Sequence, residues 1–448
     1  MNELSQAKLI SCNMSNVEIC SSAARISTTH GNSIEIFHKA KDNKKNLDLI
    51  QKVLKSGHST IIEHAVFTFA LCNVSAYVEQ FFIEYRLASF TVKSRRYVDF
   101  SNLGYYVPPE LTDADSSQYH QYMQLLFSAY QTLLENDIPK EDARFLLPYS
   151  FHSNFYCTIN ARELKNIISS MKYGRGQGIP ELQSLAGQMI CQVNAVFPGL
   201  LSDYENTPTD TCLHPAYPIQ VSDTLQVLNS NEIGNIKILN APSDSLQLLK
   251  TACQMNDPSS QSLESDELLK SKRPRELEQL SYTFLISDLT LSGITHIVRH
   301  RMQSIMIPPI QSLNHSRHII PDTVRQSGKL SDYYLHILEA ANQMVSELAD
   351  NKILNQYHYY YALSGNTMDI ITSMNARELN HFFQLRTCRR AQWEIRKISI
   401  DMLRQLRSLC PELFQYFGPR CYVNGVCPEG NLTCSQMEYT IEEFKHLS

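Results

Sequence analysis

The sequence of 448 residues lacks several features of membrane and secreted proteins. It has no apolar run long enough to cross a bilayer. Its polar N-terminus, residues 1–11, does not show the charged-then-apolar order of a secretory signal. We therefore expect a cytoplasmic protein that does not contact a membrane.

The sequence also lacks an excess of positive charge. It has 40 Lys and Arg residues and 45 Asp and Glu residues, which gives a net charge of −5. Because general nucleic-acid binding needs a basic field, the composition argues against a nucleic-acid partner. An anionic small molecule can still bind where arginines cluster locally.

Paired Cys-x-x-Cys motifs are absent, although the chain has 12 cysteines. The last four do not have the spacing of common zinc sites, and they are Cys410, Cys421, Cys427 and Cys434. In a reducing cytosol we expect free thiols in a structured tail and no metal site.

An internal repeat is present. The stretch Asn-Ala-Arg-Glu-Leu occurs at residues 160–164 and again at 375–379, an offset of 215. The same offset relates three further pairs: residues 67–69 and 282–284, Arg86 and Arg301, and Gln177 and Gln392. We therefore predict a first repeat at 1–205 and a second at 232–448, which ends in the cysteine-bearing tail. The polar, proline-bearing stretch 206–231 is the predicted linker.

Each repeat combines both kinds of secondary structure. Residues 65–74 and 281–286 have the β-branched and aromatic composition of strands. Residues 163–171, 378–385 and 391–410 have the apolar spacing of helices. This pattern predicts an α+β fold in each repeat.

Several basic residues are candidates for binding an anion. Arg299-His300-Arg301 follows an apolar helix, so we expect it at a buried end, although such a cluster is usually a solvated face. Ser94-Arg95-Arg96 could grip a phosphate or form an ordinary polar turn. Arg144 stands in an apolar run and needs a partner, either a structural carboxylate or a nucleotide. Four residues of the second repeat form a possible polar wall: Asn375, Arg377, His381 and Arg386.

These residues resemble the flavin-dependent thymidylate synthases. That family carries Arg-His-Arg, seven residues, then Ser-x-Arg-Tyr, and later Asn-x-Arg-x-Leu…Leu-Arg…Ala-Gln-x-Glu-Ile-Arg. The second repeat has Arg-His-Arg and the whole later stretch, residues 375–396. The first repeat keeps Arg86, the spacing and Ser94-Arg95-Arg96-Tyr97, and its residues 57–64 resemble the family's flavin-contacting segment.

The two repeats depart from the family in complementary ways. In the first, Arg-His-Arg has become Glu84-Tyr85-Arg86, and Met171 stands where Arg386 stands in the second. In the second, the seven-residue spacing leads to Pro309 and not to a serine. Because each repeat keeps what the other has lost, we predict one composite site per pair of repeats.

The resemblance implies two tandem units, each a curved, mostly antiparallel sheet packed with helices. It implies methylation of deoxyuridylate (dUMP) to thymidylate (dTMP), with FAD as cofactor and with NADPH and methylenetetrahydrofolate as co-substrates. Arg386 is the implied catalytic residue. The implied substrate-binding residues are Ser94, Arg95, Arg96, Arg144, His296, Arg299 and Arg386, and the implied flavin-binding residues are His58, Thr60, Arg299, His300, Arg301, Asn375, Arg377 and His381.

Two other functions stay open at this point. One is a C5-methylase of another uracil nucleotide, and the other is a homologue that binds flavin or nucleotide without turnover. The resemblance also implies a homodimer of two-unit chains, because the family assembles as a tetramer of single units.

Overall fold

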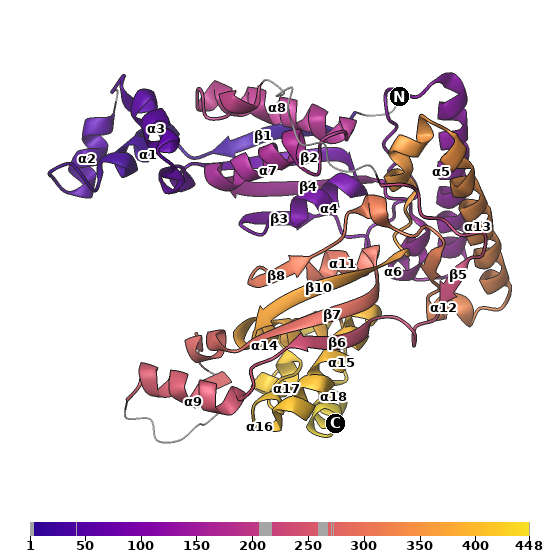
Figure 1. Cartoon of the computed structure of the whole chain (residues 1–448). Coiled ribbons are helices and arrows are strands. Elements are labelled where there is room, and N and C mark those ends of the chain that lie inside the picture. Colours follow the sequence, from indigo (N-terminus) through magenta and orange to yellow (C-terminus); the bar gives the residue numbers. More distant parts are fainter. Residues whose placement is uncertain are drawn as a thin grey trace. The chain divides into compact units, whose positions relative to one another are not determined.

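The computed structural model describes residues 4–41, 43–205, 217–258, 268–269, 271 and 273–447. The chain forms two compact units, each with its own sheet and helices (Figure 1). Unit 1 comprises Met1–Lys140, Leu146–Ile219 and Glu347–Ala362, and unit 2 comprises Glu141–Phe145, Gln220–Ser346 and Leu363–Ser448.

Unit 1 is built on a four-stranded antiparallel sheet of order β1-β2-β4-β3. Its strands are β1 Gln6–Cys12, β2 Val66–Ser75, β3 Ala88–Val92 and β4 His152–Asn160. Side chains alternate along β2, so that Phe67, Phe69 and Leu71 point into the core while their neighbours are more accessible. The alternation of apolar residues along the strand therefore gives this sheet one buried face.

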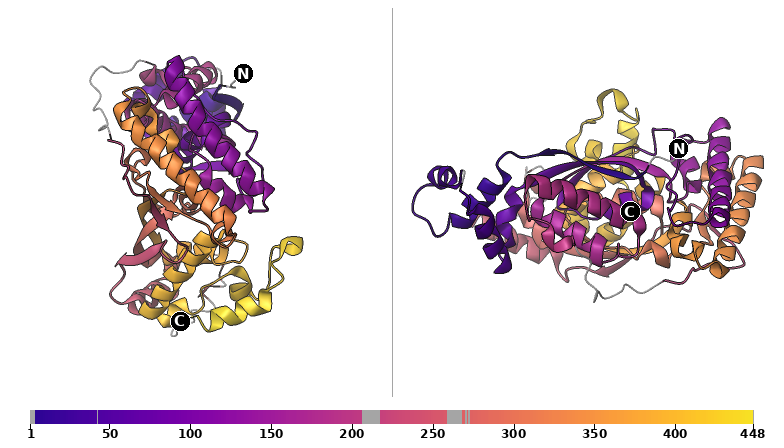
Figure 2. Two further views of the ribbon diagram at one scale, coloured as in Figure 1. Left: turned by 90° about the vertical axis from the view of Figure 1, so that its right-hand side faces the viewer. Right: turned by 90° about the horizontal axis from the view of Figure 1, so that it is seen from above.

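Helices α7 and α8 pack together and against strands β4 and β1, and so cover the buried face of the unit 1 sheet. Helices α1 to α3 pack on one another beyond one end of the sheet (Figures 1 and 2). The helices of this unit are α1 Asn16–Arg25, α2 Ser33–Ala40, α3 Asn46–Lys55, α4 Ala76–Ile83, α5 Asp113–Glu135, α7 Ala161–Tyr173 and α8 Pro180–Val196. Helix α6, Lys140–Ala143, begins at the last residue of a unit 1 segment.

Unit 2 repeats this arrangement with a sheet of order β6-β7-β10-β8. Its strands are β6 Asn235–Asn240, β7 Ser281–Thr290, β8 Gln303–Met306 and β10 Thr367–Asn375. The two sheets confirm the expected antiparallel α+β fold, and they confirm the strands predicted at 65–74 and 281–286.

The predicted linker 206–231 needs correction. Residues 206–216 lie outside the described part of the chain. Strand β5, Gln226–Leu228, pairs in parallel with β9, Arg317–Ile319, so the end of the stretch is part of unit 2. A polar, proline-bearing sequence did not reveal this pairing, because its partner lies about ninety residues further along the chain.

The helices of unit 2 confirm those predicted in the second repeat. They are α9 Ser245–Asn256, α11 Leu291–Ile297, α12 Asp322–Arg325, α13 Lys329–Glu347, α14 Ala376–Arg386, α15 Trp393–Leu409, α16 Pro411–Phe414, α17 Arg420–Asn424 and α18 Met437–Lys445. Helices α14 and α15 pack together and against strands β10 and β6. The last three helices, yellow in Figures 1 and 2, form the cysteine-bearing tail.

The two repeats exchange segments, which corrects the simple boundaries 1–205 and 232–448. Residues 141–145 of the first repeat belong to unit 2, where Asp142 accepts hydrogen bonds from Trp393 Nε1 and Thr323 Oγ1, both at 2.7 Å. Residues 347–362 of the second repeat belong to unit 1, where Tyr360 donates to Glu181 at 2.9 Å. The exchange cannot be seen in the repeat pattern, because it depends on which core each segment enters.

The structure also corrects the pairing of Gln177 with Gln392. Helix α8 begins at Pro180 and helix α15 at Trp393, so Ile179 precedes its helix as Gln392 does. In each unit the second helical residue, Glu181 or Glu394, then accepts hydrogen bonds from the last residue of a long strand, Ser75 or Thr290. The offset is therefore 213 in this part of the repeat and not 215.

Candidate functional site

The Arg-His-Arg cluster follows the short helix α11 of unit 2. The helix begins after Thr290, whose hydroxyl accepts the backbone N–H of Gly293 at 2.8 Å. All seven helical residues are buried, and the chain then turns toward the surface. His300 is 3% exposed, whereas Arg299 and Arg301 are exposed. The expected buried end is thus correct for the histidine and wrong for the two arginines.

His300 lies between a carboxylate and Arg386. Its Nδ1 is 2.8 Å from Glu378 Oε1, and its Nε2 accepts Arg386 Nε–H at 3.0 Å. Burial lowers the pKa of His300 to about 4, the hydrogen bond to Glu378 opposes this shift, and the charge of Arg386 adds to it. The imidazole is therefore neutral at pH 7, with its proton on Nδ1, where it donates to Glu378.

Arg386 is oriented by a second contact, since its Nη2 donates to the backbone carbonyl of His296 at 3.0 Å. Both acceptors, the His300 ring and this carbonyl, are neutral. These two hydrogen bonds therefore fix the plane of the guanidinium without cancelling its positive charge.

Arg144 of the first repeat is brought to the same place by the segment exchange. It is 2% exposed, its Nε donates to the Glu141 carbonyl at 3.0 Å, and its Nη2 lies 3.4 Å from His296 Nε2. Because a guanidinium only donates, Nε2 of His296 is the acceptor. We expected a carboxylate or a nucleotide beside Arg144. These contacts supply an imidazole and a carbonyl, and the buried carboxylates of Glu394 and Asp142 interact electrostatically with Arg144, so carboxylate partners are present as well. His296, Arg144, His300 and Arg386 thus form one network within unit 2.

Three predicted flavin-binding residues have structural contacts of their own. Asn375 caps α14 by accepting the backbone N–H of Glu378 at 2.9 Å. Arg377 forms an ion pair with Glu278, as Arg162 does with Glu63 in unit 1. His381 is exposed, with its ring centroid 5.7 Å from that of His300.

Two glutamates of the network were missed by sequence reasoning. Glu378 holds His300, and its signal was its place inside the repeated Asn-Ala-Arg-Glu-Leu stretch. Glu394 is fully buried, and burial raises its pKa to about 7, while Thr290 and Arg144 act in the opposite direction. The sequence signal for Glu394 was its place in the Ala-Gln-x-Glu-Ile-Arg stretch, in which it was given no separate role.

The predicted site residues of the first repeat, apart from Arg144, lie in unit 1. His58 and Thr60 are exposed; His58 directly precedes the short 3-10 helix Ser59–His64, and Thr60 lies within it. Ser94 is half-buried, and its hydroxyl accepts the Arg96 backbone N–H at 3.3 Å, so the polar-turn interpretation describes this contact.

The substrate-binding role predicted for Arg95 needs correction, because its side chain is directed into the core of unit 1. It is 4% exposed, its Nη2 is 2.7 Å from Glu79 Oε1, and its guanidinium lies 4.7 Å from the ring centroid of Phe151. A buried carboxylate partner satisfies this charge. The sequence pattern gave adjacent arginines the same role, whereas the backbone sends them to different surroundings.

In unit 1, an internal ion pair occupies the position that corresponds to the Arg-His-Arg cluster of unit 2. The counterpart of Arg299 is Glu84, which forms an ion pair with Arg175. The Arg175 guanidinium also lies 4.7 Å from the ring centroid of Phe81 and 5.7 Å from that of Tyr85. Met171, where unit 2 has Arg386, is completely buried. Unit 1 has thus replaced its cationic site by an internally paired one.

Within the described ranges, no three or more His, Cys, Asp or Glu side chains are arranged to hold a metal ion. No helix among the described residues is both long and apolar enough to cross a membrane.

Comparison with known families and proteins gives a consistent result. The family model for thymidylate synthase complementing protein matches residues 8–199 and again 237–412. A flavin-dependent thymidylate synthase of Geobacter sulfurreducens is 31% identical over 188 residues, which are 41% of this chain and 80% of that protein. One from Clostridium tetani is 34% identical over 179 residues, covering 36% of this chain and 71% of that protein.

Two solved structures also align. Thymidylate synthase X from Helicobacter pylori, with FAD and dUMP, has a TM-score of 0.36 at 21% identity, over 45% of this chain and 99% of that one. A UMP/dUMP methylase from Streptomyces cacaoi has a TM-score of 0.37 at 24% identity, over 46% and 97%. Scores this low carry no argument beyond the family match itself.

Proposed function

Since the chain belongs to the thymidylate synthase complementing protein family, we propose that it is a flavin-dependent thymidylate synthase. It converts dUMP to dTMP, with methylenetetrahydrofolate as carbon donor and NADPH as reductant. The observation that carries this proposal is the network in unit 2, in which a neutral His300 and the His296 carbonyl orient the guanidinium of Arg386.

Arg386 is the proposed catalytic residue. A fixed positive charge stabilises a uracil ring on which negative charge develops, and it needs no reorganisation at that moment. His300 positions it, because the proton on Nδ1 is held by Glu378 and Nε2 is left as an acceptor. Arg144 and His296 lie on the other side of the same network, where we expect them to orient the nucleotide.

The residues around His300 fit a flavin dinucleotide. Exposed Arg299 and Arg301 present guanidinium groups that suit a diphosphate, and exposed His381 stands beside the buried imidazole. FAD, when bound, supplies the hydride chemistry of the reaction. Asn375 and Arg377 support this surface through the α14 cap and the Glu278 ion pair. Unit 1 does not fit the same group at its corresponding position, because Glu84 and Arg175 pair there.

The residues proposed for the first repeat are fewer than predicted. Ser94 and Arg96 are retained as proposed phosphate-binding residues, and His58 and Thr60 as proposed flavin-binding residues. Arg95 is withdrawn, because Glu79 holds its guanidinium in the core. Complementary losses still favour one active site per pair of repeats.

The chain is also proposed to form a homodimer. In unit 1, Tyr156 of the central strand β4 is 55% exposed, and Leu87 just before β3 is 69% exposed. In unit 2, Met302 and Met306 at β8 are 64% and 69% exposed. Large apolar side chains on a sheet typically mark an interface. Sedimentation at micromolar concentration should give twice the chain mass, and a single-chain mass would refute the dimer.

The decisive experiment is an assay of purified protein with dUMP, methylenetetrahydrofolate, NADPH and FAD. Formation of dTMP that needs all four supports the proposal. Product from UMP in place of dUMP would assign the activity to another uracil nucleotide. Bound flavin without product from either nucleotide would assign a binding role and refute turnover.

A further inference from the structure

Apart from its first two residues, the C-terminal tail lies outside the family match, which ends at residue 412. It nevertheless packs closely on unit 2, since α17 contacts α14 and α18 contacts α17. Arg407 of α15 anchors the tail by donating to five backbone carbonyls at 2.7 to 3.2 Å, those of Phe414, Gln415, Phe417, Phe444 and Leu447. An arginine so engaged fixes several turns of chain at once.

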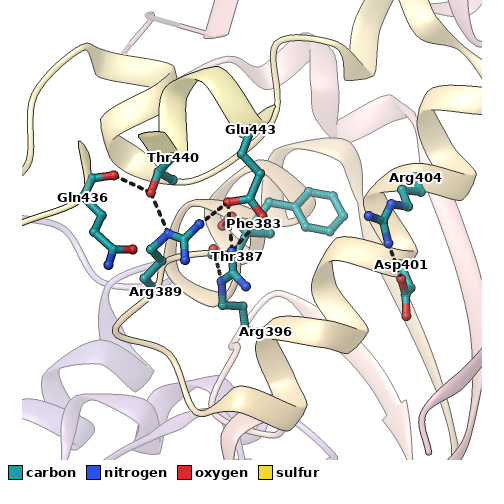
Figure 3. A network of polar contacts seen from close by, with 9 residues as sticks. All are labelled: Phe383, Thr387, Arg389, Arg396, Asp401, Arg404, Gln436, Thr440 and Glu443. Atoms are coloured by element: carbon teal, nitrogen blue, oxygen red, sulfur yellow. Dashed lines mark hydrogen bonds and ion pairs between the residues drawn. The ribbon is translucent and has the colours of Figure 1, made fainter. Parts of the chain in front are cut away.

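Glu443 of the tail bridges two arginines of unit 2 (Figure 3). Its carboxylate accepts Arg389 Nη2 at 2.6 Å and Arg396 Nη2 at 3.2 and 3.3 Å. All three side chains are only 22 to 27% exposed, so solvent screens these ion pairs less than it screens pairs on an open surface. Arg389 Nε also donates to Thr440 at 2.9 Å, and the Arg389 guanidinium lies 4.8 Å from the Tyr439 ring centroid.

The bridge encloses the turn that follows the proposed catalytic arginine. Arg389 lies in this turn, between α14 and α15, and Arg396 lies in the first turns of α15. Arg396 Nε donates to the carbonyl of Thr387 at 3.2 Å, directly after Arg386 (Figure 3). The Thr387 hydroxyl donates to the Phe383 carbonyl at 2.6 Å, which closes the last turn of α14. A continuous chain of hydrogen bonds thus runs from Glu443 through Arg396 to the end of the helix that carries Arg386.

We propose that the C-terminal tail is a clamp that positions Arg386 and that Glu443 is its positioning residue. Glu443 acts through Arg389 and Arg396, which hold the turn at 387–391. The effect on turnover rests on the proposed function, whereas the effect on the rigidity of the turn does not.

The test compares Glu443→Gln with Glu442→Gln in the full chain. Glu442 is a matched control, because it forms ion pairs with Lys445 and His446, at the end of α18 and directly after it. Glu443→Gln should lower kcat about tenfold with KM for dUMP changed less than about twofold, because small misplacements of a catalytic group lower the rate steeply. Glu443→Asp should recover part of the loss, and Glu442→Gln should match the wild type.

Amide hydrogen exchange at residues 386–391 provides a readout that does not need activity. We expect this exchange to be about tenfold faster in Glu443→Gln and unchanged in Glu442→Gln, because local opening follows the loss of the bridge. Arg389→Gln, which removes one half of the bridge, serves as a second variant should Glu443→Gln fold poorly.

The outcomes separate the two proposals. Faster exchange in a protein whose wild type forms no dTMP supports the clamp and refutes the proposed function. Unchanged exchange in both variants overturns the clamp. Faster exchange with an unchanged kcat overturns the positioning role of Glu443.

Discussion

The two units of this chain use the same scaffold around different chemistry. In unit 1, Glu84 pairs with Arg175, whose guanidinium lies near the rings of Phe81 and Tyr85. In unit 2, Arg386 donates hydrogen bonds to two neutral acceptors, the His300 ring and the His296 carbonyl, and these orient its positively charged guanidinium. The difference shows that a duplicated fold persists while one copy of its site is replaced by internal pairing.

What the two units share is the framework that builds the site. Asn160 and Asn375 cap α7 and α14 through equivalent hydrogen bonds of 2.9 Å. Each unit also has a buried glutamate, Glu181 or Glu394. It accepts a hydrogen bond from the last residue of a long strand, which is β2 in unit 1 and β7 in unit 2. These contacts satisfy backbone and hydroxyl groups that would otherwise be buried unpaired, so they are needed whether or not the unit is catalytic.

The largest expected difference between the units concerns Arg386 and Met171. Arg386→Ala should lower dTMP formation roughly a thousandfold, because it removes the charge that we propose stabilises the ionised uracil ring. Met171→Leu should leave activity unchanged, since Met171 is buried and a similar volume is kept. The measurement is kcat under saturating substrates. Equal losses in both variants would end the assignment of catalysis to unit 2.

The exchanged segments offer a smaller but more specific contrast. Arg144→Met keeps the buried stem and removes the contact with His296, and should lower kcat/KM for dUMP roughly a hundredfold. Its counterpart Tyr359 has a buried hydroxyl with no hydrogen-bond partner among the described residues, so Tyr359→Phe should change neither activity nor melting temperature. A fall in activity for Tyr359→Phe, or none for Arg144→Met, would mean that the exchanged segments do not distinguish the units.

The smallest effect is on the pH dependence of stability. The folded pKa of His300, about 4, is below the unfolded value near 6.5, so the unfolded chain binds the proton more readily. This difference is absent above about pH 7.5 and should lower the free energy of unfolding by about 2 kcal/mol at pH 5.

Denaturant unfolding of wild type and His300→Gln between pH 8 and pH 5 measures this contribution. The variant should lose less stability than the wild type over that range, by about the same 2 kcal/mol. Burial also lowers the pKa of His318 and of His358 to about 4, so both proteins should keep a residual slope. Identical slopes would show that His300 is not held neutral.

Much of the fold could be read from local pattern. The repeated Asn-Ala-Arg-Glu-Leu stretch, the apolar stripe of α15 and the β-branched runs of β2 and β7 follow from periodicity and from capping preferences, which act over a few residues. The break in the offset from 215 to 213 was missed, because a two-residue difference in a loop leaves no trace in either helix pattern.

The site was only partly predictable for the same reason. The family resemblance assigned Arg299, His300 and Arg386 to one site, yet their exposures and partners differ. Arg95 and Arg96 are neighbours in sequence, but Glu79 draws Arg95 alone into the core. Partners such as Glu378 and the His296 carbonyl are supplied by other elements, and sequence spacing does not report them.

The sequence by itself determined the duplication, the α+β class, the family and the identity of the charged residues that unit 2 keeps and unit 1 lacks. The tertiary structure alone decided that residues 141–145 enter unit 2, that His300 is neutral, and that the tail holds the turn after Arg386. The physical reason is that periodicity and motifs record local preferences. Burial, proton affinity and ion pairing depend instead on which distant segments pack together.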